Sequence, residues 1–155
     1  MARQQDDSIL LYSGVESQVI TVQEGTTAAS YVANDLIRFE STGQVILATN
    51  AVIAGIATEA ATGSTGGVSD VQDMALLDPT ALYIMTAASA VAPTQAMVGD
   101  PYNLDFTAGG HWVETTSTTP EVYIVGLYPE DYTGSAYTAG GRYIIRFLWK
   151  NFAPQ

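Results

Sequence analysis

The sequence is divided into short runs of apolar and β-branched residues by frequent turn-forming residues. Residues 18–23 alternate polar and apolar side chains, a pattern typical of a half-buried strand, and similar runs recur along the chain. Glycine pairs and an Asp-Pro pair lie between these runs, whereas helix-forming stretches are short and interrupted. We therefore predict an all-β fold, a small barrel or sandwich of short strands.

Two stretches of the chain share a faint repeat, which suggests two related β lobes. Residues 34–59 and 99–130 each contain an acid-led strand, a glycine turn, a second strand, and a strand with a central glycine. The alternative is that all β-hairpins look alike. We assign residues 1–15 to an extended N-terminal arm, 16–98 to one lobe, and 99–155 to a second lobe with an aromatic tail. The central glycines, Gly55 and Gly126, predict a bulge or a close backbone approach.

Basic residues are absent between Arg38 and Arg142, although eleven acids lie there, and the whole chain carries a net charge of −11. Such a surface cannot neutralise phosphates, so nucleic acid is excluded as a partner, and an anionic membrane would repel it. The N-terminus lacks a signal-peptide core, and no apolar run is long enough for a membrane helix. We expect synthesis in a cytoplasm.

Residues that could support catalysis or metal binding are few. There is no cysteine, and His111 is the one imidazole, without a G-x-S-x-G nucleophile motif, so we expect it to be a turn-flanking residue on a strand. Asp70, Asp73 and Asp78 could offer oxygen ligands to Ca²⁺, but their spacing is not that of an EF-hand. The glycine-rich residues 63–67 lack the lysine of a phosphate-binding loop. We expect no enzyme activity, no metal and no cofactor.

Aromatic and apolar residues provide the candidate contacts with partners. Trp112, Tyr123, Tyr128 and Trp149 are candidates for a subunit interface, and the alternative is that such rings stack on sugars. Near the N-terminus, an apolar segment could add a strand to the exposed sheet edge of a partner. This segment consists of Ile9, Leu10, Leu11 and Tyr12.

Residues 34–49, followed by Ala54-Gly55-Ile56-Ala57 and residues 58–61, resemble the head decoration (cement) proteins of tailed bacteriophages, of the lambda type. The resemblance implies a mainly β, β-tulip-like protein that forms trimers on the local three-fold axes of a capsid. It also implies an N-terminal arm that contacts the major capsid protein.

Together these patterns favour a non-enzymatic decoration protein, a homotrimer on the outer surface of the virion that stabilises the head against internal DNA pressure. One alternative is a carbohydrate- or receptor-binding β-module of a head fibre or tail. A second alternative is a small hydrolase that uses acidic pairs.

Overall fold

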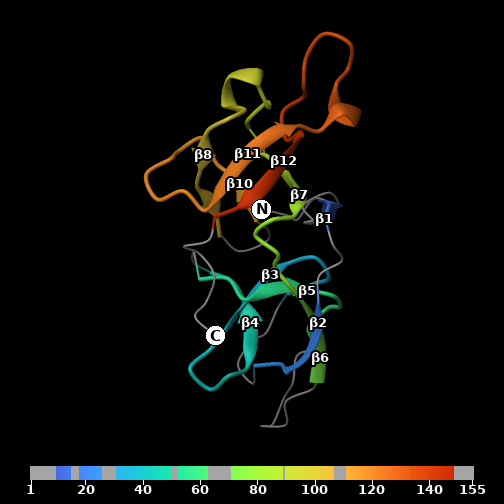
Figure 1. The fold of residues 1–155 in the computed structure, drawn as a ribbon, viewed down its shortest axis with the longest axis vertical. Helices are drawn as coiled ribbons and strands as arrows, with labels where there is room; N and C mark the ends of the chain where they lie inside the picture. Colours follow the sequence, from blue (N-terminus) through green and yellow to red (C-terminus); the bar gives the residue numbers. More distant parts are fainter. Residues whose placement is uncertain are drawn as a thin grey trace. The chain divides into compact units, whose positions relative to one another are not determined.

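A computed structural model describes residues 10–14, 18–25, 31–49, 52–62, 71–88, 90–106 and 111–148. These residues form short β-strands in antiparallel sheets, with two single-turn 3₁₀-helices, η1 (Gln95–Met97) and η2 (Pro129–Asp131), which confirms the predicted all-β fold (Figure 1). No helix in the described part of the chain is long and apolar enough to cross a membrane. The described residues divide into two units: unit 1 contains those within Met1–Val15 and Pro79–Lys150, and unit 2 contains those within Glu16–Asp78.

Unit 2 contains a five-stranded antiparallel sheet that curls into a partly closed barrel. The strand order is β2-β6-β5-β3-β4, so β2 and β4 are the two edges. Glu24, directly after β2, forms a parallel bridge with Val45, and the Gly25 N–H donates to the Val45 carbonyl at 2.8 Å. The two edges therefore meet at one end of the sheet. The strands are β2 (Val19–Gln23), β3 (Leu36–Phe39), β4 (Val45–Leu47), β5 (Gly55–Ala57) and β6 (Val71–Leu76).

Strands β3 and β4 form the predicted hairpin, with a tight turn at residues 41–43. Gly43 has φ of 81°, a left-handed conformation that glycine adopts without steric cost. The turn is closed by two backbone hydrogen bonds between Glu40 and the residues opposite: its N–H donates to Gln44, and its carbonyl accepts from Gly43. The acid that opens the motif, Asp35, is buried and accepts a hydrogen bond from the Val32 N–H at 2.8 Å. This carboxylate thus fixes the turn that leads into β3.

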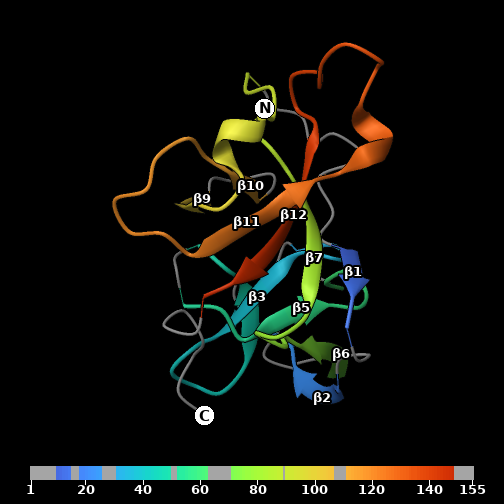
Figure 2. The same ribbon diagram turned by 45° about the horizontal axis from the view of Figure 1, so that its top comes forward.

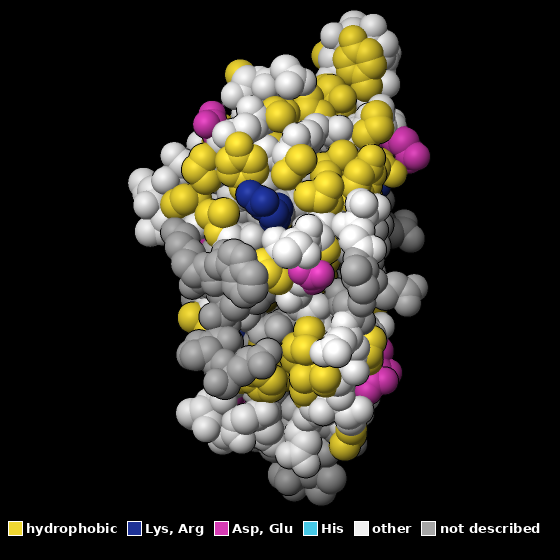
Figure 3. Space-filling model, in the orientation of Figure 1, with side chains coloured by type: hydrophobic (Ala, Val, Ile, Leu, Met, Phe, Trp, Pro, Cys, Tyr) yellow, Lys and Arg dark blue, Asp and Glu magenta, His cyan; other side chains and the backbone are white. Residues whose placement is uncertain are grey.

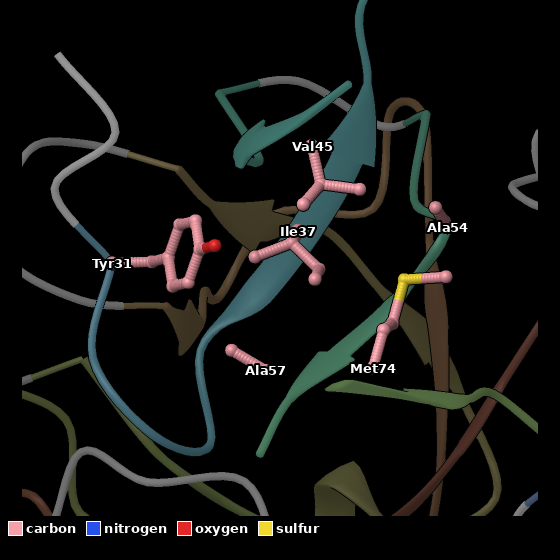
Figure 4. Close-up of a cluster of buried hydrophobic side chains, with 6 residues drawn as sticks. All are labelled: Tyr31, Ile37, Val45, Ala54, Ala57 and Met74. Atoms are coloured by element: carbon pink, nitrogen blue, oxygen red, sulfur yellow. The ribbon is translucent and has the colours of Figure 1, made fainter. Parts of the chain in front are cut away.

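The interior of unit 2 is a cluster of side chains from its strands and from the segment before β3. Figure 4 shows the Tyr31 ring pointing toward Ile37, with Val45 beside Ile37 on the neighbouring strand, and Met74 near Ala54. The Tyr31 hydroxyl is buried and has no hydrogen-bond partner among the described residues. Burial, with a smaller contribution from the negative charges of Glu24 and Glu59, raises the pKa of Tyr31 to about 12.

Unit 1 is organised around a second five-stranded sheet with the order β1-β7-β12-β11-β8 and a separate two-stranded β9–β10 ribbon (Figure 2). β12 is central, because it pairs antiparallel with β7 on one side and β11 on the other. The strands are β1 (Leu10–Ser13), β7 (Leu82–Thr86), β8 (Pro101–Tyr102), β9 (Leu104–Asp105), β10 (Trp112–Val113), β11 (Val122–Leu127) and β12 (Arg142–Phe147).

The buried face of this sheet is built from alternate residues of its three central strands. Tyr83 packs edge-on against Phe147, with ring centroids 5.3 Å apart, and Ile124 lies opposite Ile145. The buried Tyr143 hydroxyl donates to the Met97 sulfur at 3.1 Å, which connects η1 to the sheet, and burial raises the pKa of Tyr143 to about 12. The side chains of this face therefore form the hydrophobic core of unit 1.

Two predictions about chain organisation are wrong. Residues 10–13 do not form a free arm, since β1 pairs with β7 of the same chain and supplies hydrogen-bond partners for that strand. The boundary between lobes lies between Asp78 and Pro79 rather than between residues 98 and 99, because β7 pairs with β1 and β12. Residues 1–9 of the predicted arm lie outside the described residues.

The two glycine-centred strands behave as predicted. The register between β11 and β12 shifts between Ile124 and Gly126, which is a β-bulge. At Gly55 the neighbouring strand approaches so closely that a Cβ atom would lie 2.5 Å from the Ala75 carbonyl oxygen and 2.7 Å from Met74 Cγ. The acid-led strands of the two stretches also have comparable neighbours. In residues 34–59, β3 pairs with β4 and with β5; in residues 99–130, β8 pairs with β11 and β9 pairs with β10.

Gly55→Ala is expected to destabilise the protein by about 1–3 kcal/mol, because the added methyl group meets backbone that cannot move aside cheaply. Gly126→Ala is the matched control. It also lies within a strand, but its Cβ would meet only Ile144 Cδ1, at 3.8 Å, so its effect is expected to stay within about 0.5 kcal/mol. Urea unfolding followed by circular dichroism measures both. Equal stability of the two variants would contradict the packing described for β5.

Candidate interaction surfaces

The buried carboxylates of both units accept hydrogen bonds from the chain itself. In unit 2, Glu24 Oε2 accepts from the Thr62 N–H at 3.0 Å, from the Thr62 hydroxyl at 2.9 Å and from Gln72 Nε2 at 3.1 Å. In unit 1, buried Glu121 accepts from the Leu104 N–H at 2.7 Å. Because these carboxylates are buried beside their own donors, they connect loops and strands that are distant in sequence.

A patch of aromatic and charged side chains lies on unit 1, where β11 ends and β12 begins. We define the tyrosine–arginine patch as Tyr12, Tyr128, Asp131 and Arg142. The Arg142 guanidinium lies 4.4 Å from the centroid of the Tyr128 ring, and Tyr12 approaches the same ring edge-on with centroids 6.3 Å apart. Tyr12 is 46% exposed. The patch therefore presents an aromatic surface beside a positive charge held in place.

The cation of this patch is fixed by an ion pair with Asp131. Arg142 Nη2 lies 2.7 Å from Asp131 Oδ1, Nε lies 3.0 Å from Oδ2, and the Arg142 backbone N–H also donates to Oδ2 at 2.8 Å. Hydrogen bonds from Arg142 lower the pKa of Asp131, whereas a hydrogen bond with Glu130 raises the pKa of Tyr128. The Asp131 carboxylate and the Arg142 guanidinium thus hold each other in a bidentate arrangement.

Further tyrosines extend the aromatic character of unit 1. Tyr132 and Tyr137 form an isolated antiparallel bridge, and their rings lie 5.3 Å apart. On the sheet, the Arg146 guanidinium lies 5.6 Å from the Tyr123 ring centroid. Figure 3 shows hydrophobic side chains gathered around a basic group over the β11–β12 pair. This composition is typical of contact surfaces, in which Tyr and Arg are enriched.

The exposed face of the β2–β6 pair in unit 2 is a different kind of surface. Its outward residues alternate along both strands, and Val19 lies opposite Ala75, Thr21 opposite Asp73, and Gln23 opposite Val71. Val19 is 57% exposed, and β2 contains no charged side chain. The Thr21 hydroxyl donates to Asp73 Oδ1 at 3.1 Å. β2 is thus an uncharged edge strand with β-branched residues turned to solvent.

The residues predicted to contact the capsid or a sister subunit do not form one site. Tyr12 and Tyr128 come together in the tyrosine–arginine patch, and Tyr123 packs against Arg146 on the sheet. Trp112 is 9% exposed on β10, so little of its ring is left for a partner. Leu10 and Leu11 lie on β1, whereas Ile9 and Trp149 are outside the described residues.

His111 is buried, with 2% of its surface exposed, and its ring packs edge-on against Phe106 at 5.6 Å. Pro129–Asp131 form a 3₁₀ turn whose aspartate pairs with Arg142. In the described ranges no group of three or more His, Cys, Asp or Glu side chains could hold a metal ion. Asp70 and residues 63–67 lie outside those ranges.

Sequence reasoning missed the ion pair, because Asp131 and Arg142 are separated by a long connection and show no local spacing rule. The chain did offer one indication: Arg142 is the first basic residue after Arg38, and the pair Glu130-Asp131 follows a proline. An isolated cation near clustered acids and tyrosines favours an ion pair with a cation–π contact.

Replacing Asp131 with Asn is expected to lower stability by about 0.5–1 kcal/mol at about pH 7, since the ion pair is partly exposed. The folded-state pKa of Asp131 is depressed, so its contribution is present above the unfolded value, near 3.8, and disappears as the pH falls through the folded value. The stability difference between wild type and Asp131→Asn should therefore shrink at about pH 2. Urea unfolding at both pH values measures it, and an unchanged difference would contradict the ionic origin.

Comparison of the chain with models of protein families, with curated proteins and with solved structures finds no match. The surfaces described above are therefore interpreted from their own geometry.

Proposed function

We propose that this chain is a non-enzymatic capsid decoration protein of a tailed bacteriophage. Trimers would bind the outer surface of the mature head through the major capsid protein and oppose the pressure of packaged DNA. A protein that binds the mature lattice more tightly than its precursor stabilises the mature state by mass action. No nucleic acid, membrane or cofactor takes part in this function.

The observation that carries the proposal is the use of the acids within the fold. The three buried carboxylates in the described part of the chain, Glu24, Asp35 and Glu121, and the half-buried Asp131 accept hydrogen bonds from the chain's own donors. Glycoside hydrolysis would need two carboxyl groups facing a common substrate, one of them with a raised pKa. In this chain these carboxylates connect strands and turns, which supports a structural role for the acids.

The resemblance to decoration proteins is consistent with this interpretation. Its motif residues build the barrel of unit 2: Asp35 fixes the turn before β3, Gly43 forms the hairpin turn, and Gly55 allows β6 to approach. These residues therefore have architectural roles, which agrees with a family defined by its fold and its place in a capsid.

The tyrosine–arginine patch is the surface that we assign to capsid contact. The sequence led us to expect that this apolar segment adds a strand to the sheet of a partner. Because β1 already pairs with β7, we assign the capsid contact instead to the Tyr12 side chain and its neighbours. Tyr supplies a large contact area with few rotatable bonds, and both Tyr and Arg are enriched among the residues that contribute most binding energy at protein interfaces.

Cosedimentation of the purified chain with empty, expanded heads of the encoding phage tests the proposal. Wild type is expected to saturate the heads, and the Tyr12→Ala/Tyr128→Ala double variant to bind about 30-fold more weakly, the loss caused by a hot spot of about 2 kcal/mol. Tyr132→Ala is the matched control, since this tyrosine is 50% exposed but lies outside the patch. Absence of wild-type binding to expanded heads would overturn the proposal.

A carbohydrate-binding module is the second candidate, favoured by the exposed Tyr12 ring beside hydrogen-bonding groups of Asp131 and Arg142. Sugars stack on aromatic faces and use adjacent charged groups to bind their hydroxyls. Isothermal titration with glucose-, galactose- and mannose-terminated oligosaccharides would then show binding that Tyr12→Ala abolishes and Tyr132→Ala retains. Absence of heat with all three sugars, together with binding to heads, would exclude this candidate.

A further inference from the structure

The edge strand β2 lacks the features that normally prevent edge strands from pairing with other chains. Proteins protect exposed edges with lysine, proline, inward-pointing charges or a covering segment. β2 has the sequence Val-Ile-Thr-Val-Gln, without a charge or a proline, and both Val19 and Thr21 are exposed. On its other side it pairs with β6 over its whole length.

The hydrogen-bond pattern shows which backbone groups of β2 face away from the sheet. The Leu76 N–H donates to the Gln18 carbonyl at 2.8 Å, and these two residues are opposite each other in the register. In an antiparallel ladder, hydrogen-bonded pairs alternate with pairs that are not bonded to each other. Ile20 and Val22 therefore bond to β6, while the N–H and C=O groups of Val19 and Thr21 point outward.

The far end of the edge is already occupied by the same chain. Glu24 bridges to Val45 in parallel, and this bridge closes the barrel directly after Gln23. The turn at residues 41–43 immediately precedes β4, so β4 does not continue along the rest of β2. Within the described chain, Val19 and Thr21 thus supply an open edge that is two backbone pairs long.

We propose that two copies of this chain pair through their β2 edges, antiparallel, about a two-fold axis at Ile20. Val19 of each copy then lies opposite Thr21 of the other, and the four outward N–H and four outward C=O groups of the two strands satisfy one another. The exposed side chains of Val19 and Thr21 form cross-strand β-branched pairs, which are favourable in sheets.

The charge distribution along β2 is compatible with a second copy as the partner. Each chain has a net charge of −11, so two copies can meet closely only where acids are absent, and β2 carries none. Asp73 is the outward acid on the neighbouring strand β6, opposite Thr21. In the paired sheet, the two Asp73 side chains lie three strand spacings apart, about 14 Å, and in different rows. That separation exceeds the Debye length of about 8 Å at physiological salt.

This contact is independent of the proposed decoration function and of the trimer. A two-fold contact cannot close a three-fold ring, so it would join copies from neighbouring trimers on a capsid, or two chains in solution. Its test therefore requires no capsid.

Cysteine cross-linking tests the contact and its register, because the native chain has no cysteine. Val19→Cys and Thr21→Cys proteins are mixed, oxidised with copper phenanthroline and separated without reductant. The mixture is expected to give at least about 10-fold more disulfide-linked dimer than either variant alone. In the proposed register Val19 of one copy lies opposite Thr21 of the other, and directly opposite Cβ atoms lie about 4.5–5.5 Å apart. Val71→Cys is the control, since it is exposed on the same face but lies on β6, away from the edge.

A proline variant provides the second measurement. Thr21→Pro removes an N–H that points outward, so the unit should still fold, and circular dichroism checks this. Its weight-average mass in sedimentation equilibrium is expected to fall below that of wild type at equal concentration. The proposal would be overturned if the mixture gave no more disulfide-linked dimer than Val71→Cys. It would also be overturned if Thr21→Cys alone gave more disulfide-linked dimer than the mixture. An unchanged mass for a folded Thr21→Pro protein would also overturn it.

Discussion

Closure of the unit 2 sheet at Glu24 and Gly25 is the interaction on which the rest of that unit depends. A five-stranded sheet of three- to six-residue strands encloses a core only if its edges are brought together. The Gly25–Val45 hydrogen bond and the Glu24 bridge do this at one end. A Cβ atom at Gly25 would lie 2.5 Å from Ile46 Cγ2, so the close contact of the two edges relies on glycine.

The buried Glu24 carboxylate gives the closure its specificity. It is fully buried and accepts hydrogen bonds from Thr62 and Gln72, which belong to a distant loop and to β6. A buried carboxylate without such donors would cost several kcal/mol, so the arrangement is stable only when all three segments are in place. The same logic appears in unit 1, where Asp131 positions Arg142 and thereby the start of β12. In both units, acids determine where irregular segments meet strands.

The sequence predicted most strands because their pattern is local. β-Branched alternation identified residues 18–23 as a strand, and Gly55 and Gly126 predicted a close approach and a bulge, both of which occur. Features that depend on distant partners were not predictable in this way. The pairing of β1 with β7, the burial of Trp112 and the Asp131–Arg142 ion pair all join residues that no local spacing connects. The candidate surfaces were therefore predicted in composition, as tyrosine-rich and poor in cations, but not in arrangement.

The order of strands along the chain has a consequence for synthesis on the ribosome. β1 and β7 are neighbours in one sheet, yet all the described strands of unit 2 are inserted between them. The described strands of unit 2 are contiguous in sequence and can pair as soon as β6 has emerged, whereas β1 must wait until β7 and the central strand β12 have been made. At about 5–20 residues per second, the 134 residues from Ser13 to Phe147 take about 7–27 seconds, and closing so long a loop carries an entropic cost. The nascent chain therefore carries an early strand with unpaired backbone groups beside a finished barrel, a state in which β1 is open to capture by another chain.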